Sequence, residues 1–417
     1  MNKKRNFVRV ATAGITFQAG SAAIDSATIM SALVYQLTGS SVVVGAVTAV
    51  LRFGWLSPQL FVGFLAQRGG SSMHYYVIGA FGRAMCMALL AVALLVGADW
   101  PTALLSIVVM VLWTAYAFVS GIVAVPYNDI VARSVPSEQR SRLLATRFFG
   151  GGVLALGIAV IADRLLGNLT FPHSYGVIIA MASLLMFLSS AVFVSVGEPE
   201  ARTTTAAKPT FLEYLTDGIE VFQTDARFRL FVYAQWCGGA VLMAMPFYVV
   251  HADAVGFGLE RVALLLGAQT TGALASNFLW GWWGDKLGKR SLLRAIAIGR
   301  VLPPAVILVL ASTQTTDDAT MLYIFVGLFF VLGALANGLT IAVIGFLMEI
   351  SPDNLRPAYS GYFNAITAPA FLLPLLAGVI AAVFELLIVF VISMIAAIIQ
   401  SCILLMIAKP PAGSSAR

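Results

Sequence analysis

Long apolar stretches alternate with short polar segments along the whole chain. Each stretch holds about 20 residues or more, enough for a helix to cross the roughly 30 Å hydrocarbon core of a bilayer. Lipid offers the backbone no hydrogen-bond partners, so such stretches cross a membrane as helices. The pattern predicts an all-α membrane protein with twelve transmembrane helices, at residues 8–36, 41–66, 75–97, 101–126, 143–166, 175–196, 229–251, 261–283, 291–312, 320–347, 358–382 and 386–408.

The composition excludes a water-soluble protein. Of the 417 residues, 60% are hydrophobic and only 11% are charged, against about 25% charged in a typical soluble domain. The net charge of +6 does not indicate nucleic-acid binding, because it is not carried by a basic soluble domain. Histidine, cysteine and acidic residues do not cluster at metal-ligand spacings, so we expect no metal or other cofactor.

Charge is distributed unevenly between the segments that join the spans. Lysine and arginine gather on one side, and acidic residues such as Asp99, Asp253 and Glu385 lie on the other. Positively charged loops remain in the cytoplasm. We therefore predict an integral protein of the inner (cytoplasmic) membrane with both termini in the cytoplasm.

Pairs of short segments recur at a nearly constant offset. The stretch GFLAQRGGSS (63–72) precedes GWWGDKLGKR (281–290) by 218 residues, and Gly82-Arg83 precedes Gly299-Arg300 by 217. Matches that stay in register over half the chain indicate a tandem duplication of a six-helix unit.

The two bundles expected from this duplication occupy residues 1–196 and 229–417, with a cytoplasmic linker at 197–228. The linker contains FLEYLTDGIEVF, in which apolar residues recur at helical spacing. Such an amphipathic helix lies on a membrane surface, so we expect it on the cytoplasmic side.

Two six-helix bundles joined by an inner linker resemble the plan of the major facilitator superfamily. One sequence element of this family is a Glu followed, after six residues, by an Arg, and it is present here as Glu349 and Arg356. The resemblance implies a secondary transporter in which two bundles rock around a site at the middle of the membrane. The loop motif of the superfamily is matched in full by Gly281, Asp285, Lys286, Gly288, Lys289 and Arg290.

The resemblance assigns this loop motif to an inner gate. Gly281 is expected to let two helices approach closely, and Gly288 to permit a tight turn. Asp285 is expected to bind the positive end of a neighbouring helix or an arginine.

The first half departs from the motif. It keeps Arg68 and Arg140 as basic gate residues, but Gln67 and Arg133 stand where the second half has its two acids. We therefore expect an asymmetric gate that the second half holds closed.

Four charged residues lie well inside the predicted spans: Asp25, Arg52, Arg83 and Arg300. Charges at that depth are costly and mark functional sites by default. Asp25 lies 14 residues before Gly39 and Arg52 lies 13 after it, so both are roughly 15 Å or more from the outer surface and level with each other. We expect them to form an ion pair at a substrate and proton-coupling site. The alternative is a pair that only joins the two spans.

Polar residues accompany this pair. Gln18 and Thr28 share the polar face of Asp25, and Gln59 shares that of Arg52. Arg83 and Arg300 occupy equivalent repeat positions, and we expect structural roles for them near the inner helix ends. Further cavity candidates, chosen by polarity alone, are Trp113, Gln235, Asn337 and Asn364.

These features predict a secondary transporter for a small organic solute, driven by protons or another ion and acting as a monomer. Proton-coupled export is preferred, because the repeat position of Arg52 lies near Thr270, which is not basic. The alternatives are uptake of a small anion or metabolite, and a non-transporting sensor derived from a transporter. An enzyme is not expected, since the spans contain no nucleophile with a base, no second acid and no metal-binding set.

Overall fold

The computed structural model describes residues 3–67, 71–135, 137–197, 210–258, 261–312, 318–351 and 356–407. Within these segments the chain is helical, and eleven helices are long and apolar enough to cross a membrane. A further span, the first one predicted from the sequence, is divided into two shorter helices, α1 (Lys3–Ala22) and α2 (Ile29–Thr38). It brings the number of spans to twelve. The predicted all-α class with twelve spans is therefore confirmed.

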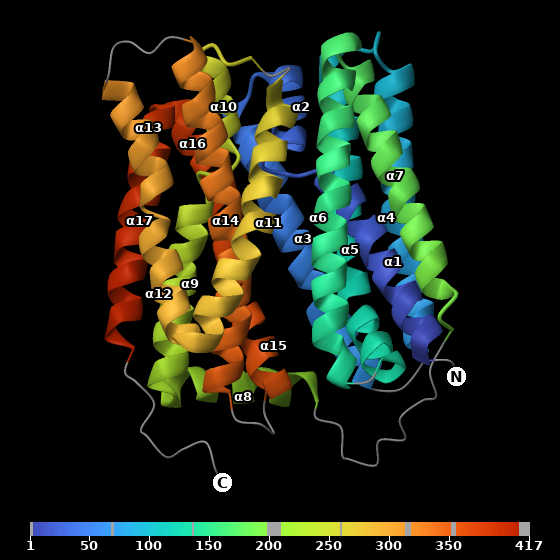
Figure 1. Ribbon diagram of the computed structural model, residues 1–417, viewed down its shortest axis with the longest axis vertical. Coiled ribbons are helices and arrows are strands. Elements are labelled where there is room, and N and C mark those ends of the chain that lie inside the picture. The colour runs from blue at the N-terminus through green and yellow to red at the C-terminus, as the bar shows by residue number, and fades with distance from the viewer. Residues whose placement is uncertain are drawn as a thin grey trace.

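The helices of the first half stand side by side in one bundle (Figure 1). The amphipathic segment of the linker forms α8 (Phe211–Thr224), which lies across one end of the molecule. The start of α1 and the end of the last helix lie at this same end, called here the α8 end. After α1 and α2, the first half contains α3 (Ser41–Gln67), α4 (Ser72–Val96), α5 (Thr102–Ser134), α6 (Ser137–Asn168) and α7 (His173–Val194).

The second half forms the other bundle (Figure 1). It contains α9 (Ala226–Leu242), α10 (Phe247–Ala254), α11 (Val262–Lys286), α12 (Lys289–Gly299), α13 (Leu302–Ser312), α14 (Asp318–Ile350), α15 (Arg356–Thr367), the 3-10 helix η2 (Ala368–Leu372), α16 (Leu373–Val383) and α17 (Leu386–Met406).

Four spans are interrupted inside the bundles. Pro246, Pro303 and Pro369 stand at or just after the interruptions of the seventh, ninth and eleventh spans, where a residue without an N–H ends the helical ladder. The first span is interrupted without a proline, at residues 23–28. The interruptions of the first and seventh spans lie about 220 residues apart, close to the offset of the sequence repeat. Interrupted helices leave backbone polar groups free where a cavity or a binding site can use them.

The two bundles touch closely at the end opposite α8. A Cβ atom added to Gly45 would lie 2.1 Å from the carbonyl oxygen of Pro374, and one added to Gly378 would lie 2.5 Å from that of Ser41. Only glycine permits the backbones of α3 and α16 to approach so closely. These contacts close the space between the bundles at this end.

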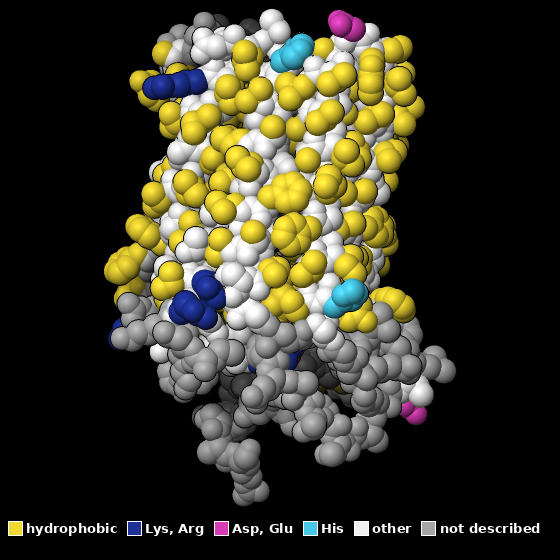
Figure 2. Space-filling model, turned by 90° about the vertical axis from the view of Figure 1, so that its right-hand side faces the viewer, with side chains coloured by type: hydrophobic (Ala, Val, Ile, Leu, Met, Phe, Trp, Pro, Cys, Tyr) yellow, Lys and Arg dark blue, Asp and Glu magenta, His cyan; other side chains and the backbone are white. Residues whose placement is uncertain are grey.

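The outer surface is suited to lipid. Figure 2 shows hydrophobic side chains over the middle of one side of the molecule, with charged side chains toward its two ends. Large apolar side chains such as Phe278 and Leu184 are 84% and 69% exposed. An apolar belt of this kind belongs in a bilayer, and the chain is an integral membrane protein.

Candidate functional site

A polar cavity of about 590 Å³ lies between the bundles. It is bounded by α1, α3 and α6 of the first half and by α11 and α14 of the second. Its volume is typical of a site for a small molecule. The polar side chains that line it are Gln18, Ser21, Asp25, Arg52, Trp55, Arg147, Gln269, Thr270, Asn277, Asn337 and Thr340.

The cavity lies on the α8 side of the contacts that close the other end. Along its wall Gly152 of α6 meets Leu274 of α11, where an added Cβ would lie 2.3 Å from the leucine. A smaller space of about 90 Å³ extends from Asp25 and Arg52 to Pro374. Both halves therefore contribute to one site near the middle of the membrane.

Asp25 lies in the interruption between α1 and α2 and holds the turn that leads into α2. Its Oδ1 accepts the backbone N–H groups of Ala27 and Thr28, both at 3.0 Å, and the hydroxyl of Thr28 at 2.9 Å. An Asp side chain that accepts from the backbone two and three residues on stabilises a local turn. The same residue faces the cavity, which places an acidic group at the junction of two helix segments.

Arg52 lines the cavity with its side chain exposed to it. Among the described residues no ion pair joins Arg52 and Asp25, so the pair expected from their depth is not formed in this state. Oδ1 of Asp25 is instead engaged by the turn at residues 27–28, and Oδ2 has no donor among the described residues. Equal depth along two helices does not by itself bring two side chains into contact.

Arg147 is a cavity residue that sequence reasoning missed. It lies ten residues after the start of α6, or about 15 Å from that end of the helix, and it lines the cavity beside Phe148. Its Nη1 donates to the hydroxyl of Tyr127 at 3.1 Å. Its place four residues inside the predicted span at 143–166 could have marked it as an intramembrane charge.

Asn337 lies on the second-half wall of the cavity. Its amide nitrogen donates to the carbonyl oxygen of Ala273 at 3.2 Å and to Oδ1 of Asn277 at 2.8 Å. The pair of amides joins α11 to α14. Gln18 faces the same cavity from α1.

Four other candidates are not placed along this cavity in the described structure. Trp113 is fully buried, donates to the carbonyl oxygen of Val47 at 2.9 Å, and belongs to the core. Gln59 donates to the carbonyl oxygen of Trp55 at 2.7 Å. Gln235 has a buried amide nitrogen without an acceptor, and Asn364 is exposed elsewhere.

The loop motif at 281–290 forms the turn between α11 and α12. Gly288 has a φ of +85°, which explains the glycine there. The expected role of Gly281 in a close helix contact is wrong, because an added Cβ would meet nothing within 4 Å. Lys289 packs its carbon chain against Gly345 of α14, 2.9 Å from the position of an added Cβ.

The remaining gate residues are placed only in part. Lys286 and Glu349 are exposed, and Arg290 has a buried Nε without an acceptor. Arg68 lies outside the described residues, and so do the side chains of Asp285, Arg140 and Arg356.

The first half has an acidic contact at the α8 end that the sequence comparison did not foresee. Asp129 of α5 forms an ion pair with Arg133, and its Oδ2 accepts the hydroxyl of Ser72 at 2.6 Å. Ser72 begins α4, so the contact joins two helix ends. Asp129 thus supplies an acid at the α8 end of the first half, one turn before Arg133.

The fold and the cavity define a class of protein. Interrupted transmembrane helices around a polar cavity between two bundles are the architecture of a secondary transporter. In the second half, the sequence matches the Major Facilitator Superfamily over residues 243–417.

Solved transporters have a similar fold over nearly the whole chain. A mutant of the nucleoside transporter NupG is 12% identical, with a TM-score of 0.75, covering 97% of this chain and 100% of that one. A D-xylose-proton symporter is 14% identical, with a TM-score of 0.70 and coverage of 97% and 98%. A bacterial homologue of the iron transporter ferroportin, in an inward-facing state, is 15% identical, with a TM-score of 0.65 and coverage of 97% and 99%.

Curated relatives match a smaller part of the chain. The uncharacterized protein Rv2209 of Mycobacterium tuberculosis is 21% identical over 335 residues, which are 77% of this chain and 64% of the relative. The uncharacterized protein Mb2232 of Mycobacterium bovis gives the same values. The chain thus spans slightly less than two thirds of the length of these relatives.

The match in the second half and the shared fold confirm the resemblance carried by the loop motif. The second half of the chain is thus similar to the Major Facilitator Superfamily, and the whole chain shares the fold of these solved transporters.

Proposed function

We propose that this transporter moves a small organic solute by alternating access through the central cavity, coupled to protons that bind Asp25. The supporting observation is that Asp25 is the one acidic side chain among the described residues that line this cavity. It also lies where α1 ends and α2 begins. A proton there changes the charge of the cavity at the point where a helix is already divided.

The two oxygens of Asp25 have different surroundings. Oδ1 holds the turn at Ala27 and Thr28, whereas Oδ2 has no donor among the described residues. Oδ2 is therefore the atom that takes the proton, and the turn before α2 is kept through Oδ1. A pH difference of one unit supplies about 1.4 kcal/mol per proton, enough for roughly tenfold accumulation of solute.

Export in exchange for protons is the direction that the sequence favours. Uptake of a small anion together with protons is the second candidate, and one observation favours it. Export was preferred because the second half has no basic residue at the repeat position of Arg52. That position lies near Thr270, an uncharged residue that lines the cavity. Arg147 supplies a second basic group from the first half, so Arg52 and Arg147 both face the cavity.

Transport in proteoliposomes tests the proposal. Purified protein is reconstituted with a pH-sensitive dye inside, and proton movement is recorded when organic acids, amphiphilic amines and neutral sugars are added in turn. Asp25→Asn should keep solute exchange but lose accumulation driven by a pH gradient, because the amide oxygen can still accept the hydrogen bonds of the turn before α2 and cannot take up a proton. Asp99→Asn, at an exposed acid outside the cavity, is the matched control.

Each outcome separates the candidates. Proton influx coupled to solute efflux indicates export, and parallel movement of both indicates uptake. Full gradient-driven accumulation in Asp25→Asn would exclude Asp25 as the coupling group. A wild-type protein that binds solute and moves none would favour the sensor.

We further propose that the α8 end faces the cytoplasm in the inner membrane. The basic segments and the surface helix α8 lie at this end in the predicted topology. Single cysteines at Thr216 of α8 and at Asp99, in a background without Cys86, Cys237 and Cys402, test it with an impermeant reagent. Labelling of the Asp99 site alone in intact cells supports the orientation, and labelling of the Thr216 site in intact cells would reverse it.

The loop motif of the second half is proposed to close the α8 end in the opposite state. Asp285→Asn should then favour the form open at the α8 end, whereas Gln67→Asp should change little. Spin-label distances across that end decide between them. Equal effects of both substitutions would contradict an asymmetric gate.

A further inference from the structure

A second cavity, of about 350 Å³, lies within the first half and adjoins the central one. The two cavities share Phe17, Trp55 and Arg147 in their walls. It is called here the side chamber, and α1, α4, α5 and α6 contribute most of its lining. The two cavities are therefore neighbours, with Phe17, Trp55 and Arg147 between them.

Arg83 lines the side chamber as a buried cation without a counter-ion. Only 5% of its surface is exposed, and its guanidinium lies 3.9 Å from the centre of the Phe17 ring. Its Nε is buried without an acceptor, and no acidic side chain pairs with it in the described structure. A buried charge without an opposite charge is unfavourable, so a bound anion would stabilise this arrangement.

Arg147 presents a second guanidinium to the same space. Its one hydrogen bond is the donation to Tyr127, and its Nε is also buried without an acceptor. Its carbon chain crosses α1 at Gly14, where an added Cβ would lie 2.4 Å from Cδ of the arginine. The absence of a side chain at position 14 thus allows Arg147 to lie where it does.

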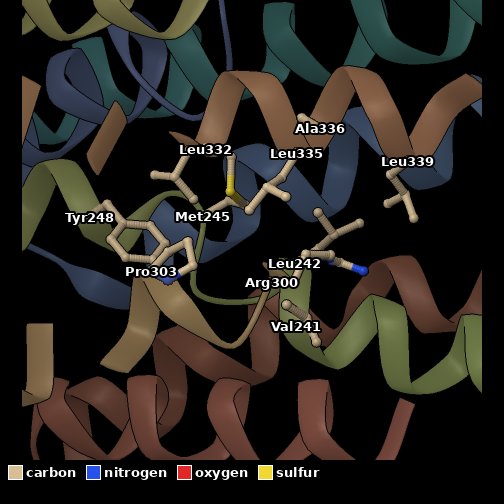
Figure 3. Close-up of a pocket in the computed structure, with 10 residues that line it drawn as sticks. All are labelled: Val241, Leu242, Met245, Tyr248, Arg300, Pro303, Leu332, Leu335, Ala336 and Leu339. Atoms are coloured by element: carbon tan, nitrogen blue, oxygen red, sulfur yellow. The ribbon is translucent and has the colours of Figure 1, made fainter. Parts of the chain in front are cut away.

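Arg300, the equivalent arginine of the second half, has hydrogen-bond acceptors within the protein, as expected for a structural role. Nη1 of Arg300 donates to Oε1 of Gln400 and Nη2 to the carbonyl oxygen of Gly238, both at 3.0 Å. Figure 3 shows Arg300 in a pocket lined mainly by apolar side chains such as Leu335, with a volume of only about 30 Å³. Arg83 has no such acceptors among the described residues and faces a space about ten times larger.

The nearest acid on α5 is already engaged. Asp129 pairs with Arg133 and accepts from Ser72, and it does not line the side chamber. Arg83 and Arg147 are the only ionised side chains among the described residues of its lining, beside the hydroxyls of Tyr76 and Tyr127. Two guanidinium groups with phenol hydroxyls suit a carboxylate or a phosphate, which arginine binds through paired N–H groups.

We propose that Arg83 and Arg147 form an anion-binding subsite for a carboxylate or phosphate group of the transported solute. This inference rests on the proposed function, since it names the class of solute that the transporter moves. The charged group enters the side chamber, and the rest of the solute occupies the central cavity between Asp25 and Asn337. The transported solute is accordingly an organic anion.

Binding to the purified, delipidated protein in detergent tests the subsite. The probes are inorganic phosphate, glycerol 3-phosphate and benzoate, with glycerol and benzamide as uncharged counterparts, and binding is measured by isothermal titration calorimetry. Saturable binding of at least one organic anion and of neither uncharged probe is expected. Arg83→Gln and Arg147→Gln should each weaken it at least tenfold.

Two variants guard against loss of folding and non-specific effects of charge. Gly14→Ala keeps every charge but displaces Arg147, and it should weaken anion binding while the protein remains folded. Arg164→Gln removes an exposed arginine of α6 outside the chamber and should bind as the wild type does. The subsite would be overturned if the single variants Gly14→Ala and Arg147→Gln both bound the anion with wild-type affinity. It would also be overturned if the wild-type protein showed no saturable anion binding.

The outcomes are separate from those of the proposed function. Asp25→Asn should bind the anion and yet fail to accumulate it with a pH gradient. Normal binding in the arginine variants with a coupling defect in Asp25→Asn would reject the subsite alone. Anion binding that depends on both arginines without proton-driven transport would reject the coupling alone. An anionic phospholipid retained by the wild type and lost from Arg83→Gln, detected by mass spectrometry, would assign the subsite to a lipid headgroup instead.

Discussion

Thr28 donates both its backbone N–H and its hydroxyl to Oδ1 of Asp25, at 3.0 and 2.9 Å. The two residues thereby form a defined turn within the interruption of the first span, immediately before α2. One carboxylate fixes the geometry of the divided helix through one oxygen and faces the cavity. Changes of charge in the cavity and movement of α2 are thus linked at a single side chain.

Thr28→Val should loosen this turn without changing the shape of the side chain. The hydroxyl donor is lost and the backbone donor remains, so we expect a loss of about 1 kcal/mol of stability. Because the residue proposed to take the proton also holds this turn, the pH dependence of transport should also shift. Melting in detergent and transport at several external pH values measure both effects.

Thr16→Val is the matched control. Thr16 is buried in α1 and its hydroxyl donates to the carbonyl oxygens of Thr12 and Ala13 in its own helix. It should change neither the pH profile nor the solute specificity. An unchanged pH profile in Thr28→Val would mean that the hydrogen bond from the Thr28 hydroxyl does not affect proton coupling.

Gln400→Leu should destabilise the second half strongly. Gln400 accepts from Arg300 and donates to the carbonyl oxygen of Ala234 at 3.0 Å, and both bonds are buried. Removing the acceptor of a buried charge costs about 2–3 kcal/mol, which thermal unfolding in detergent can measure.

Two further variants identify the cause. Gln400→Glu keeps an acceptor and adds a charge opposite to that of Arg300, so it should be better tolerated than Gln400→Leu. Arg300→Met in the Gln400→Leu background should recover part of the lost stability, since a buried pair can be replaced by apolar residues. If the double substitution adds the two losses instead, the Arg300–Gln400 bond is not the source.

The sequence predicted the large features because their signals are periodic or local. Twelve apolar stretches are sufficient to predict twelve spans, and a glycine inside a charged turn predicted the left-handed backbone at Gly288. The offset of the repeat also identified Arg83 and Arg300 as equivalent. These patterns depend on residue type and spacing along the chain.

The cavity was harder to predict because it depends on the direction of side chains across helices. Trp55 and Trp113 are of the same residue type, and only Trp55 faces the cavity. The interruption at residues 23–28 contains neither proline nor glycine, so no helix-breaking residue indicated that the first span would be divided at Asp25. Arg147 lies four residues inside the predicted span at 143–166, and only the structure shows that it lines the cavity.

Acid should loosen the start of α8. The backbone N–H of Thr210 donates to Oε2 of Glu213 at 2.7 Å. This bond, together with the hydroxyl of Thr210, lowers the pKa of Glu213 below its ordinary value of 4.5. A carboxylate with a lowered pKa in the folded helix stabilises it above the unfolded pKa, and the contribution is lost as the pH falls through the folded pKa. A spin label at Ile219 should therefore become more mobile below about pH 4.5.

Glu213→Gln should remove the acid-dependent step in label mobility, because its amide oxygen accepts the same hydrogen bond without titrating. Glu220→Gln, on the same helix, serves as the control and should retain the step. A step that persists in Glu213→Gln would assign the pH dependence to another group.

Gly45→Ala should shift the transporter toward the form that is open at the end opposite α8. The new Cβ would lie 2.1 Å from the carbonyl oxygen of Pro374 and 3.1 Å from the backbone nitrogen of Gly378. These are backbone atoms, so α3 and α16 can relieve the clash only by moving apart. Overpacking of this kind costs about 1–3 kcal/mol, which corresponds to a change of roughly 5- to 150-fold in the ratio of two conformations.

Pairs of spin labels at the two ends measure this shift. One pair at Ser40 and Val383 spans the closed end, and another at Val8 and Leu287 spans the α8 end. Since the two bundles move as rigid bodies in alternating access, the first distance should lengthen while the second shortens. Gly157→Ala, where an added Cβ meets nothing within 4 Å, should leave both distances unchanged. A longer first distance with an unchanged second one would mean that the bundles yield locally at α3 and do not rock about the cavity.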